Sequence, residues 1–213
     1  MMNNALIKVC GMRDGENIRE VEALGIDLMG FIFWPKSSRY VSEIPEYMPT
    51  HCKRVGVFVD EDIEQVKHIV NDYALDIIQL HGSESPDYAR QLRSVCDDGI
   101  SIIKAINIAT ADDFKATKPF EGIVDYLLFD TKAQLPGGNG EKFDWSILEA
   151  YNGNTPFLLS GGIGPDDGER VKVFLTSHLN SRCIGIDLNS RFELVPGLKD
   201  IFKLREFLAS LLN

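Results

Sequence analysis

Two residues able to transfer protons end apolar runs of the sequence: the thiol Cys10 and the carboxyl Asp130. Cys10 ends the run LIKVC and precedes Gly11, and Asp130 ends the run YLLFD. A thiol and a carboxyl facing one cavity could divide proton removal and proton donation between them. Each also has an ordinary interpretation, because a lone cysteine is often a small buried hydrophobe and an aspartate after a strand often forms a turn. The chemical hypothesis requires a fold that brings the two together.

Three further polar residues follow other apolar runs. Arg39, in the segment WPKSSRY, could hold a carboxylate or stack on an aromatic ring, or it could be a solvated loop residue. Gln79 and His81 share one face at the end of the run DIIQL, where the His81 ring could instead bond the backbone of a turn. We interpret all three as candidate substrate-binding residues.

Two turns near the end of the chain have the composition of a phosphate site. The first contains Gly161, Gly162 and Ile163, and the second contains Asp187, Asn189 and Ser190. Glycines let backbone N–H groups approach a phosphate closely, and barrels often bind phosphate in their last two loops. An ordinary glycine turn is the alternative for each segment alone.

The elements that must position these residues are eight short apolar runs, rich in β-branched and aromatic residues. They span 5–9, 28–33, 54–59, 76–80, 101–106, 125–129, 156–160 and 183–188, and such runs are typical of buried parallel strands. Most are separated by amphipathic stretches, and helix starts are predicted after Asp14, Asp60, Ser85, Pro165 and Gly197. The stretch 40–50 is the weakest helix, and 132–143 is predicted to be a long loop.

Alternation of strand and helix eight times predicts an α/β protein with a single (β/α)8 TIM barrel domain over residues 1–213. A doubly wound sheet is the rival, but the sequence lacks its nucleotide fingerprint. In a barrel, reactive groups lie at the carboxyl ends of the strands. Leu6, Lys8 and Cys10 would then share the inward face of the first strand, opposite Asp130 on the sixth.

Composition narrows the classes of partner. Net charge is −10, with 22 Lys and Arg against 32 Asp and Glu, which argues against nucleic acid. No apolar stretch is long enough to span a membrane, and the amino terminus has no export signal, so a cytoplasmic protein is expected. The four scattered cysteines contain no CxxC pair, so neither a disulfide framework nor a zinc site is indicated.

At this point the sequence resembles the phosphoribosylanthranilate isomerases of tryptophan biosynthesis over nearly its whole length. The resemblance rests on the order and spacing of the motifs KVCGMRD (8–14), GFIFWPKSSRYV (30–41), RVGVFVD (54–60), IIQLHGSES (78–85), LLFDTK (127–132), GGNGEKFDW (137–145), LLSGGI (158–163), GIDLNSRFE (185–193) and PGLKD (196–200).

The resemblance implies a (β/α)8 barrel without a cofactor, acting on a small phosphosugar–anthranilate substrate as a monomer or homodimer. The reaction is an Amadori rearrangement of N-(5′-phosphoribosyl)anthranilate to 1-(2-carboxyphenylamino)-1-deoxyribulose 5-phosphate. It implies that Cys10 is the general base and Asp130 the general acid, that Arg39 holds the anthranilate part, and that the turns at 161–163 and 187–190 take the phosphate. Cys10 would act as a thiolate, with Lys8 as one candidate cation to assist it.

The sequence departs from the family pattern in two loops. Asn139 stands where threonine usually precedes the last glycine of the 137–140 loop, and Arg191 stands where glycine is common. The charge of Arg191 could assist phosphate binding, and the 132–143 loop could close over the substrate.

Two other functions would fit parts of the pattern. The histidine-pathway isomerase resembles this family in mechanism but uses two aspartates, and Cys10 points away from it. A non-catalytic phosphate-binding protein would need the glycine turns but neither Cys10 nor Asp130.

Overall fold

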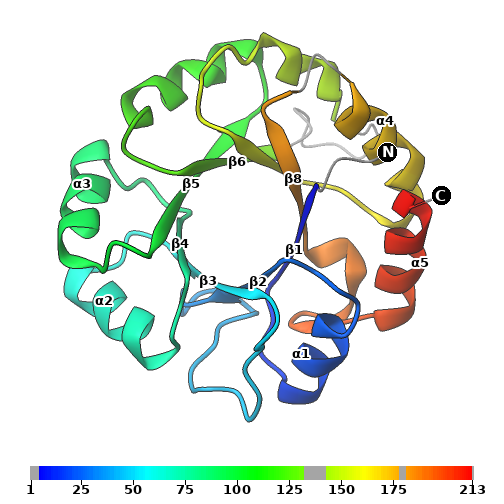
Figure 1. Ribbon diagram of the computed structural model, residues 1–213, viewed down its shortest axis with the longest axis horizontal. Helices are drawn as coiled ribbons and strands as arrows, with labels where there is room; N and C mark the ends of the chain where they lie inside the picture. The colour runs from blue at the N-terminus through cyan, green and yellow to red at the C-terminus, as the bar shows by residue number, and fades with distance from the viewer. Residues whose placement is uncertain (1–4, 132–142, 178–180, 213) are drawn as a thin grey trace.

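The computed structural model describes residues 5–131, 143–177 and 181–212, and its centre is a closed barrel of eight parallel strands (Figure 1). Each strand pairs with its sequence neighbours, and β1 pairs with β8 to close the ring. The strands are β1 Leu6–Cys10, β2 Leu28–Ile32, β3 Lys53–Phe58, β4 Ile77–Leu80, β5 Ser101–Ile108, β6 Tyr126–Thr131, β7 Phe157–Ser160 and β8 Cys183–Leu188. The predicted barrel and the position of every strand are confirmed within two residues.

The outer layer of the barrel is less regular than the alternation predicted. The α-helices of the described residues are α1 Gly15–Glu22, α2 Ile63–Asp72, α3 Pro86–Val95, α4 Gly168–Thr176 and α5 Ile201–Leu212. The connections after β5 and β6 contain 3-10 helices instead, η1 Ala111–Phe120 and η2 Trp145–Ala150. The weak helix predicted at 40–50 is wrong: this stretch has bends and no helix. Pro45 and Pro49 remove two backbone donors there.

Side-chain caps fix where the first helices begin. Asp14 accepts from the Asn17 N–H at 2.8 Å, and Ser85 accepts from the Tyr88 N–H at 3.1 Å, as their sequences predicted. The predicted start at Asp60 is wrong, because α2 is capped by Asp62. Asp60 has a positive φ of 51° and accepts instead from Ser83, in the loop after β4.

The inward face of the barrel changes character along the strands. Near the amino-terminal ends it is an apolar cluster of Leu28, Val55, Ile77, Ile103, Leu128 and Leu158. Two residues further along, polar side chains occupy several of the inward positions, including Lys8, Gln79, Asp130, Ser160 and Asp187. Because side chains alternate across a strand, this two-residue step places a polar layer directly above an apolar floor.

A short hairpin after β8 was not predicted. It consists of β9 Glu193–Val195 and β10 Leu198–Lys199, paired antiparallel, and is preceded by the 3-10 turn η5 Ser190–Phe192. The side chain of Asn17 on α1 holds it through both backbone groups of Lys199. The hairpin therefore packs beside the carboxyl end of β1, where Cys10 lies.

Within the described residues, the fold involves neither a membrane-spanning helix nor a disulfide bond. None of the helices within the described ranges is long and apolar enough to cross a membrane. Cys10, Cys52, Cys96 and Cys183 are all free thiols.

Candidate active site

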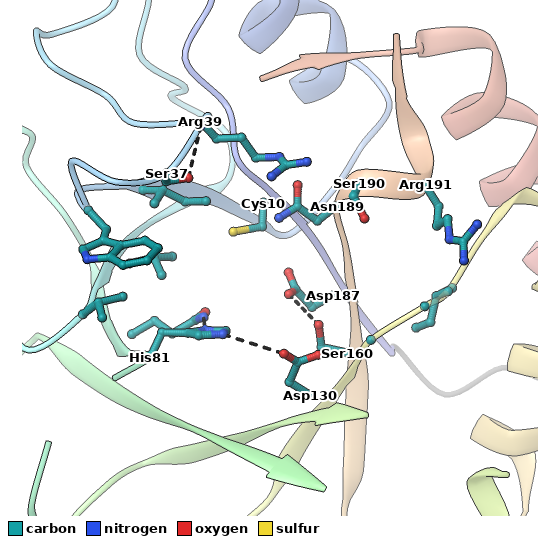
Figure 2. A pocket seen from close by; sticks show the side chains of 18 residues that line it. Cys10, Ser37, Arg39, His81, Asp130, Ser160, Asp187, Asn189, Ser190 and Arg191 are labelled. Carbon is teal, nitrogen blue, oxygen red and sulfur yellow. Dashed lines mark hydrogen bonds and ion pairs between the residues drawn. The ribbon is translucent and has the colours of Figure 1, made fainter. Parts of the chain in front are cut away.

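A cavity of about 410 Å³ opens at the carboxyl ends of the strands (Figure 2). Every site residue predicted from the sequence lines it: Cys10, Arg39, Gln79, His81, Asp130, Gly161, Gly162, Ile163, Asp187, Asn189 and Ser190. These residues come from β1, β4, β6 and β8 and the loops that follow strands 2, 4, 7 and 8. The barrel thus brings together residues up to 180 positions apart in the chain, although their individual roles remain predictions.

The Cys10 thiol lies at the edge of the cavity in a tightly packed position. Its residue is only 4% exposed, and a Cβ atom on Gly30 of β2 would lie 2.7 Å from its Sγ. Only glycine therefore leaves room for the thiol at this point of the neighbouring strand. Burial raises the pKa of the Cys10 thiol, and the Lys8 ammonium acts in the opposite direction.

Lys8 is fully buried directly below Cys10 on the same face of β1. Its Nζ donates to Oδ1 of Asp187 at 2.8 Å, and the Ser160 hydroxyl donates to Oδ2 of Asp187 at 3.0 Å. Burial acts to lower the pKa of Lys8, but Asp187 and Cys10 outweigh it, so the pKa is raised and the ammonium stays charged. A permanent cation consequently lies beneath the thiol.

Asp130 faces the cavity from β6, with His81 as a neighbour. The His81 Nε2 lies 3.9 Å from Asp130 Oδ2, which is longer than a hydrogen bond, and Nδ1 lies 2.8 Å from Nε2 of the buried Gln79. Burial lowers the pKa of His81, while Asp130 acts to raise it. Because the Gln79 amide nitrogen donates to Nδ1, a neutral His81 ring carries its proton on Nε2, the nitrogen that faces the Asp130 carboxyl.

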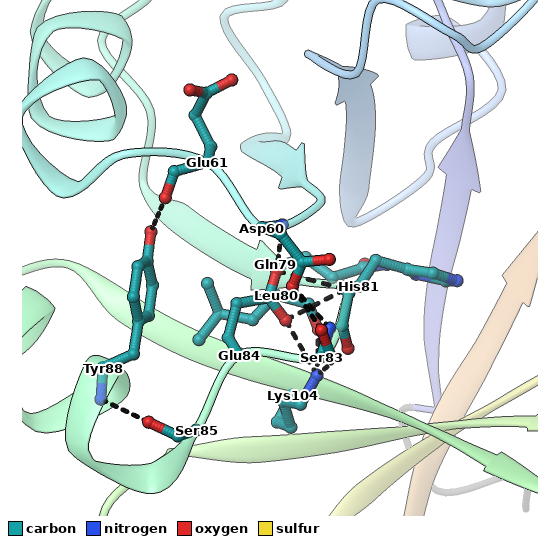
Figure 3. A network of polar contacts seen from close by, with 11 residues as sticks. Asp60, Glu61, Gln79, Leu80, His81, Ser83, Glu84, Ser85, Tyr88 and Lys104 are labelled. Carbon is teal, nitrogen blue, oxygen red and sulfur yellow. Dashed lines mark hydrogen bonds and ion pairs between the residues drawn. The ribbon is translucent and has the colours of Figure 1, made fainter.

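A second polar network supports the loop that carries His81 (Figure 3). Glu84 accepts from the Asp60 N–H at 2.9 Å and from the Gly82 N–H at 2.9 Å, and it pairs with the Lys104 ammonium at 3.0 Å. Lys104 also donates to the Gly82 carbonyl at 2.7 Å. Both charged side chains are almost completely buried. The loop after β4 is therefore fixed by charge-assisted hydrogen bonds rather than by apolar contacts.

One end of the cavity consists of the two loops that follow β7 and β8. Gly161 and Gly162 have φ angles of +95° and +67°, so successive N–H groups can form a concave anion site. Asn189, Ser190 and Arg191 line the same end. The Asp187 carboxylate accepts from Lys8 and Ser160, and an ionised carboxylate has no proton to donate to a phosphate.

The other end is apolar and lies near the loop after β2. Ile32, Trp34, Val57 and Val59 line it, and Arg39 reaches over Cys10 towards Asn189 (Figure 2). Trp34 is 36% exposed and lines the cavity, although it was not among the site residues predicted from the sequence. Its position directly after an apolar run was the signal, since loops at this end of a barrel carry the site.

Sequence reasoning also missed residues that act on the predicted ones. Ser160 bonds Asp187, and Glu193 and Lys199 form ion pairs beside Arg39. Glu193 lies in the motif GIDLNSRFE and Lys199 in the motif PGLKD, but nothing in the local sequence shows that either contacts Arg39. Among the described residues no group of three or more His, Cys, Asp and Glu side chains could hold a metal ion.

Comparison with known proteins agrees with this geometry. The family model for N-(5′-phosphoribosyl)anthranilate (PRA) isomerase matches residues 7–210. The isomerase of Parabacteroides distasonis is 50% identical, over 98% of this chain and 94% of its own length. That of Phocaeicola vulgatus is 46% identical, over 97% of each chain.

Solved structures give the same result. The phosphoribosylanthranilate isomerase of Thermotoga maritima superposes with a TM-score of 0.82 at 29% identity, covering 97% of this chain and 98% of its own. An isomerase in complex with reduced 1-(o-carboxyphenylamino)-1-deoxyribulose 5-phosphate superposes with a TM-score of 0.78 at 27% identity and the same coverage. The chain therefore belongs to the N-(5′-phosphoribosyl)anthranilate isomerase family and is an isomerase of tryptophan biosynthesis.

Proposed function

We propose that Cys10 is the general base and Asp130 the general acid of this isomerisation. The observation that carries the proposal is that the two side chains line one cavity from β1 and β6. Protonated Asp130 donates to the ribose ring oxygen, and the ring opens to a Schiff base. The Cys10 thiolate then takes the proton from C2′, and the resulting enolamine tautomerises to the ketone.

The two ends of the cavity suit the two ends of the substrate, the phosphate and the anthranilate. The turns at 161–163 and 189–191 offer N–H groups and the Arg191 cation to the phosphate. Trp34 and its apolar neighbours suit the anthranilate ring, and Arg39 suits the ring carboxylate. Gln79 and His81 line the middle, next to Asp130. The ribose would then lie between the proposed base and acid, as the reaction requires.

Lys8 gives the buried thiol a route to its reactive form. Desolvation alone would keep the Cys10 thiol protonated. The Lys8 ammonium, two residues earlier on the same face of β1, favours the thiolate. Asp187 and Ser160 keep that ammonium in place. We assign Asp187 this positioning role in place of contact between its side chain and the phosphate.

Turnover measurements on single variants test the division of labour. We expect purified wild-type protein to quench anthranilate fluorescence when it meets freshly made N-(5′-phosphoribosyl)anthranilate. Loss of a general acid or base costs roughly 10²–10⁴ in rate. An Asp130→Asn variant that binds the reduced product but turns over at the wild-type rate would remove Asp130 from the mechanism.

We propose that the chain acts as one domain, as a monomer or homodimer in the cytoplasm. The family match over residues 7–210 supports the single domain, and the four free thiols fit a reducing compartment. The T. maritima isomerase is described as dimeric and has also been solved as monomers. Analytical ultracentrifugation of the full chain measures the oligomeric state directly. The predicted lid at 132–143 lies almost wholly outside the described residues and stays a prediction, as does the departure at Asn139.

A further inference from the structure

A charged cluster lies beside the cavity and includes residues that the mechanism has not used. Its members are Arg39, in the loop after β2, and Glu193 and Lys199, one on each strand of the hairpin. We call it the Arg39–Glu193–Lys199 cluster. The Glu193 and Lys199 side chains are 5% and 0% exposed, whereas Arg39 is 20% exposed and lines the cavity. Two buried charges therefore support one that faces the cavity.

Glu193 fixes the plane of the Arg39 guanidinium. Its Oε2 accepts from Nη2 at 2.6 Å, and its Oε1 accepts from Nε at 2.8 Å. Two parallel bonds of this kind allow the guanidinium one orientation. They occupy the Nε–Nη2 edge, so Nη1 and the second Nη2 proton are what Arg39 can offer to a ligand in the cavity.

Lys199 prevents Glu193 from neutralising this site. Its Nζ donates to Glu193 Oε1 at 2.7 Å and to Asn189 Oδ1 at 2.8 Å. Burial acts to raise the pKa of Glu193, but bonds from Arg39 and Lys199 outweigh it and hold the pKa at about 2. Two cations and one carboxylate leave the cluster with a net charge of +1. It can therefore still attract an anion.

The cluster is packed against the turn that follows the thiol. Gly11 has a φ of +80°, and a Cβ atom on it would lie 2.6 Å from Arg39 Cδ and 2.8 Å from Asn189 Oδ1. Lys199 is itself held through its backbone by Asn17 of α1. The hairpin thus fixes the Arg39 side chain relative to Cys10, while the loop after β2 holds its backbone.

We propose that Glu193 is a positioning residue for recognition of the substrate's aromatic carboxylate. It holds Arg39 with its remaining N–H edge towards that carboxylate, and Lys199 supplies the charge that keeps the cluster cationic. The inference rests on the proposed role of Arg39 and deepens it. The alternative is that Glu193 only stabilises the hairpin, through Lys199 and the Gly197 N–H at 3.0 Å.

Two ligands that differ only in the carboxylate separate these roles. The first is reduced 1-(o-carboxyphenylamino)-1-deoxyribulose 5-phosphate, and the second is the same compound without the carboxyl group. We expect Glu193→Gln to weaken inhibition by the carboxylated ligand about tenfold, which is the value of one charge-assisted hydrogen bond, and inhibition by the other less than about twofold. The substrate KM should rise more than kcat falls.

The matched control is Glu22→Gln, which neutralises another buried carboxylate away from the cavity. Glu22 accepts from the N–H groups of Thr50 and His51, so its substitution costs stability but should change neither inhibition constant. Glu193→Asp provides a second variant that keeps the charge but withdraws it from Arg39, and it should show the same carboxylate-selective loss. Equal losses for the two ligands in both Glu193 variants, or no loss, would overturn the proposal.

Arg39→Met distinguishes failure of this inference from failure of the proposed function. If Arg39→Met loses affinity for the carboxylated ligand alone while the Glu193 variants do not, Arg39 keeps its role and only the positioning role of Glu193 is refuted. If Arg39→Met treats both ligands alike, the carboxylate is bound elsewhere and the premise itself is wrong.

Discussion

Burial and the Lys8 ammonium shift the pKa of the Cys10 thiol in opposite directions. Burial raises its pKa, whereas a general base must be deprotonated, and Lys8 is the nearest group on its own strand that favours the thiolate. The sequence indicated Cys10, Lys8 and Asp130 because each ends or alternates along an apolar run. It could not indicate Glu193, since the contact with Arg39 spans 154 residues and depends on a hairpin with no strong local pattern.

The raised pKa of Cys10 predicts that turnover increases with pH. Below that pKa the thiolate fraction grows tenfold per pH unit, so kcat/KM should rise from pH 7 towards pH 9, until another group or the stability of the substrate limits it. Stopped-flow fluorescence over this range measures the profile. A profile that is flat between pH 7 and 9 would contradict a thiol base with this environment.

Replacing Lys8 should shift the dependence of kcat/KM on pH. Lys8→Met removes the cation beneath the thiol, so the rising limb should shift to higher pH, and activity at pH 7 should fall more than activity at pH 9. The variant also leaves Asp187 buried without its partner, which destabilises the fold by about 3–5 kcal/mol. Ser160→Ala is the comparison for the Asp187 contacts: it removes one contact to Asp187 but keeps the Lys8 cation, so the limb should shift less than in Lys8→Met.

At the scale of the elements, the strands were predictable and several connections were not. Eight apolar runs of strand length, each followed by a turn, define a barrel almost uniquely. The connection after β5 forms a 3-10 helix that contains Pro119, and Asp62 rather than Asp60 caps α2. Asp60 and Asp62 are both suitable caps in sequence; the contact of Asp60 with the loop after β4 decides between them.

The Glu84–Lys104 pair holds that loop and should be sensitive to loss of one partner. Lys104→Met leaves a buried carboxylate without its cation and should lower the free energy of unfolding by about 3–5 kcal/mol, as measured by urea denaturation. Glu84→Gln should cost less, because the amide oxygen can still accept from the Asp60 and Gly82 N–H groups. A Lys104→Met protein as stable as the wild type would show that the pair does not support the loop.

At the scale of the whole molecule, carboxylates with lowered pKa link stability to pH. The pKa of Glu193 is held at about 2, and the pKa of Glu22 is also lowered, because hydrogen bonds to the charged forms outweigh burial. Unfolded carboxyls titrate near 4.5. The stabilisation is therefore complete above about pH 4.5 and is lost as pH falls towards 2.

We expect the thermal unfolding temperature to fall steeply below pH 4.5 and to change little between pH 5.5 and 7. Differential scanning calorimetry of the wild type and Glu22→Gln measures this. The variant should lose stability at pH 7, and its difference from the wild type should shrink as pH falls below 4.5, because the pKa of Glu22 is lowered by folding and the stabilisation of its charged form is lost in that direction. A constant difference between the two proteins across this range would contradict the linkage.

The measurement that most directly tests the proposed mechanism is single-turnover loss of anthranilate fluorescence by Cys10→Ala. Because Ala is smaller and the thiol lies against Gly30, the cavity and the binding of the reduced product should be preserved. We predict a rate reduced by roughly 10²–10⁴ with the inhibition constant of the reduced product unchanged within about threefold. A Cys10→Ala enzyme that turns over near the wild-type rate would contradict the assignment of Cys10 as the general base.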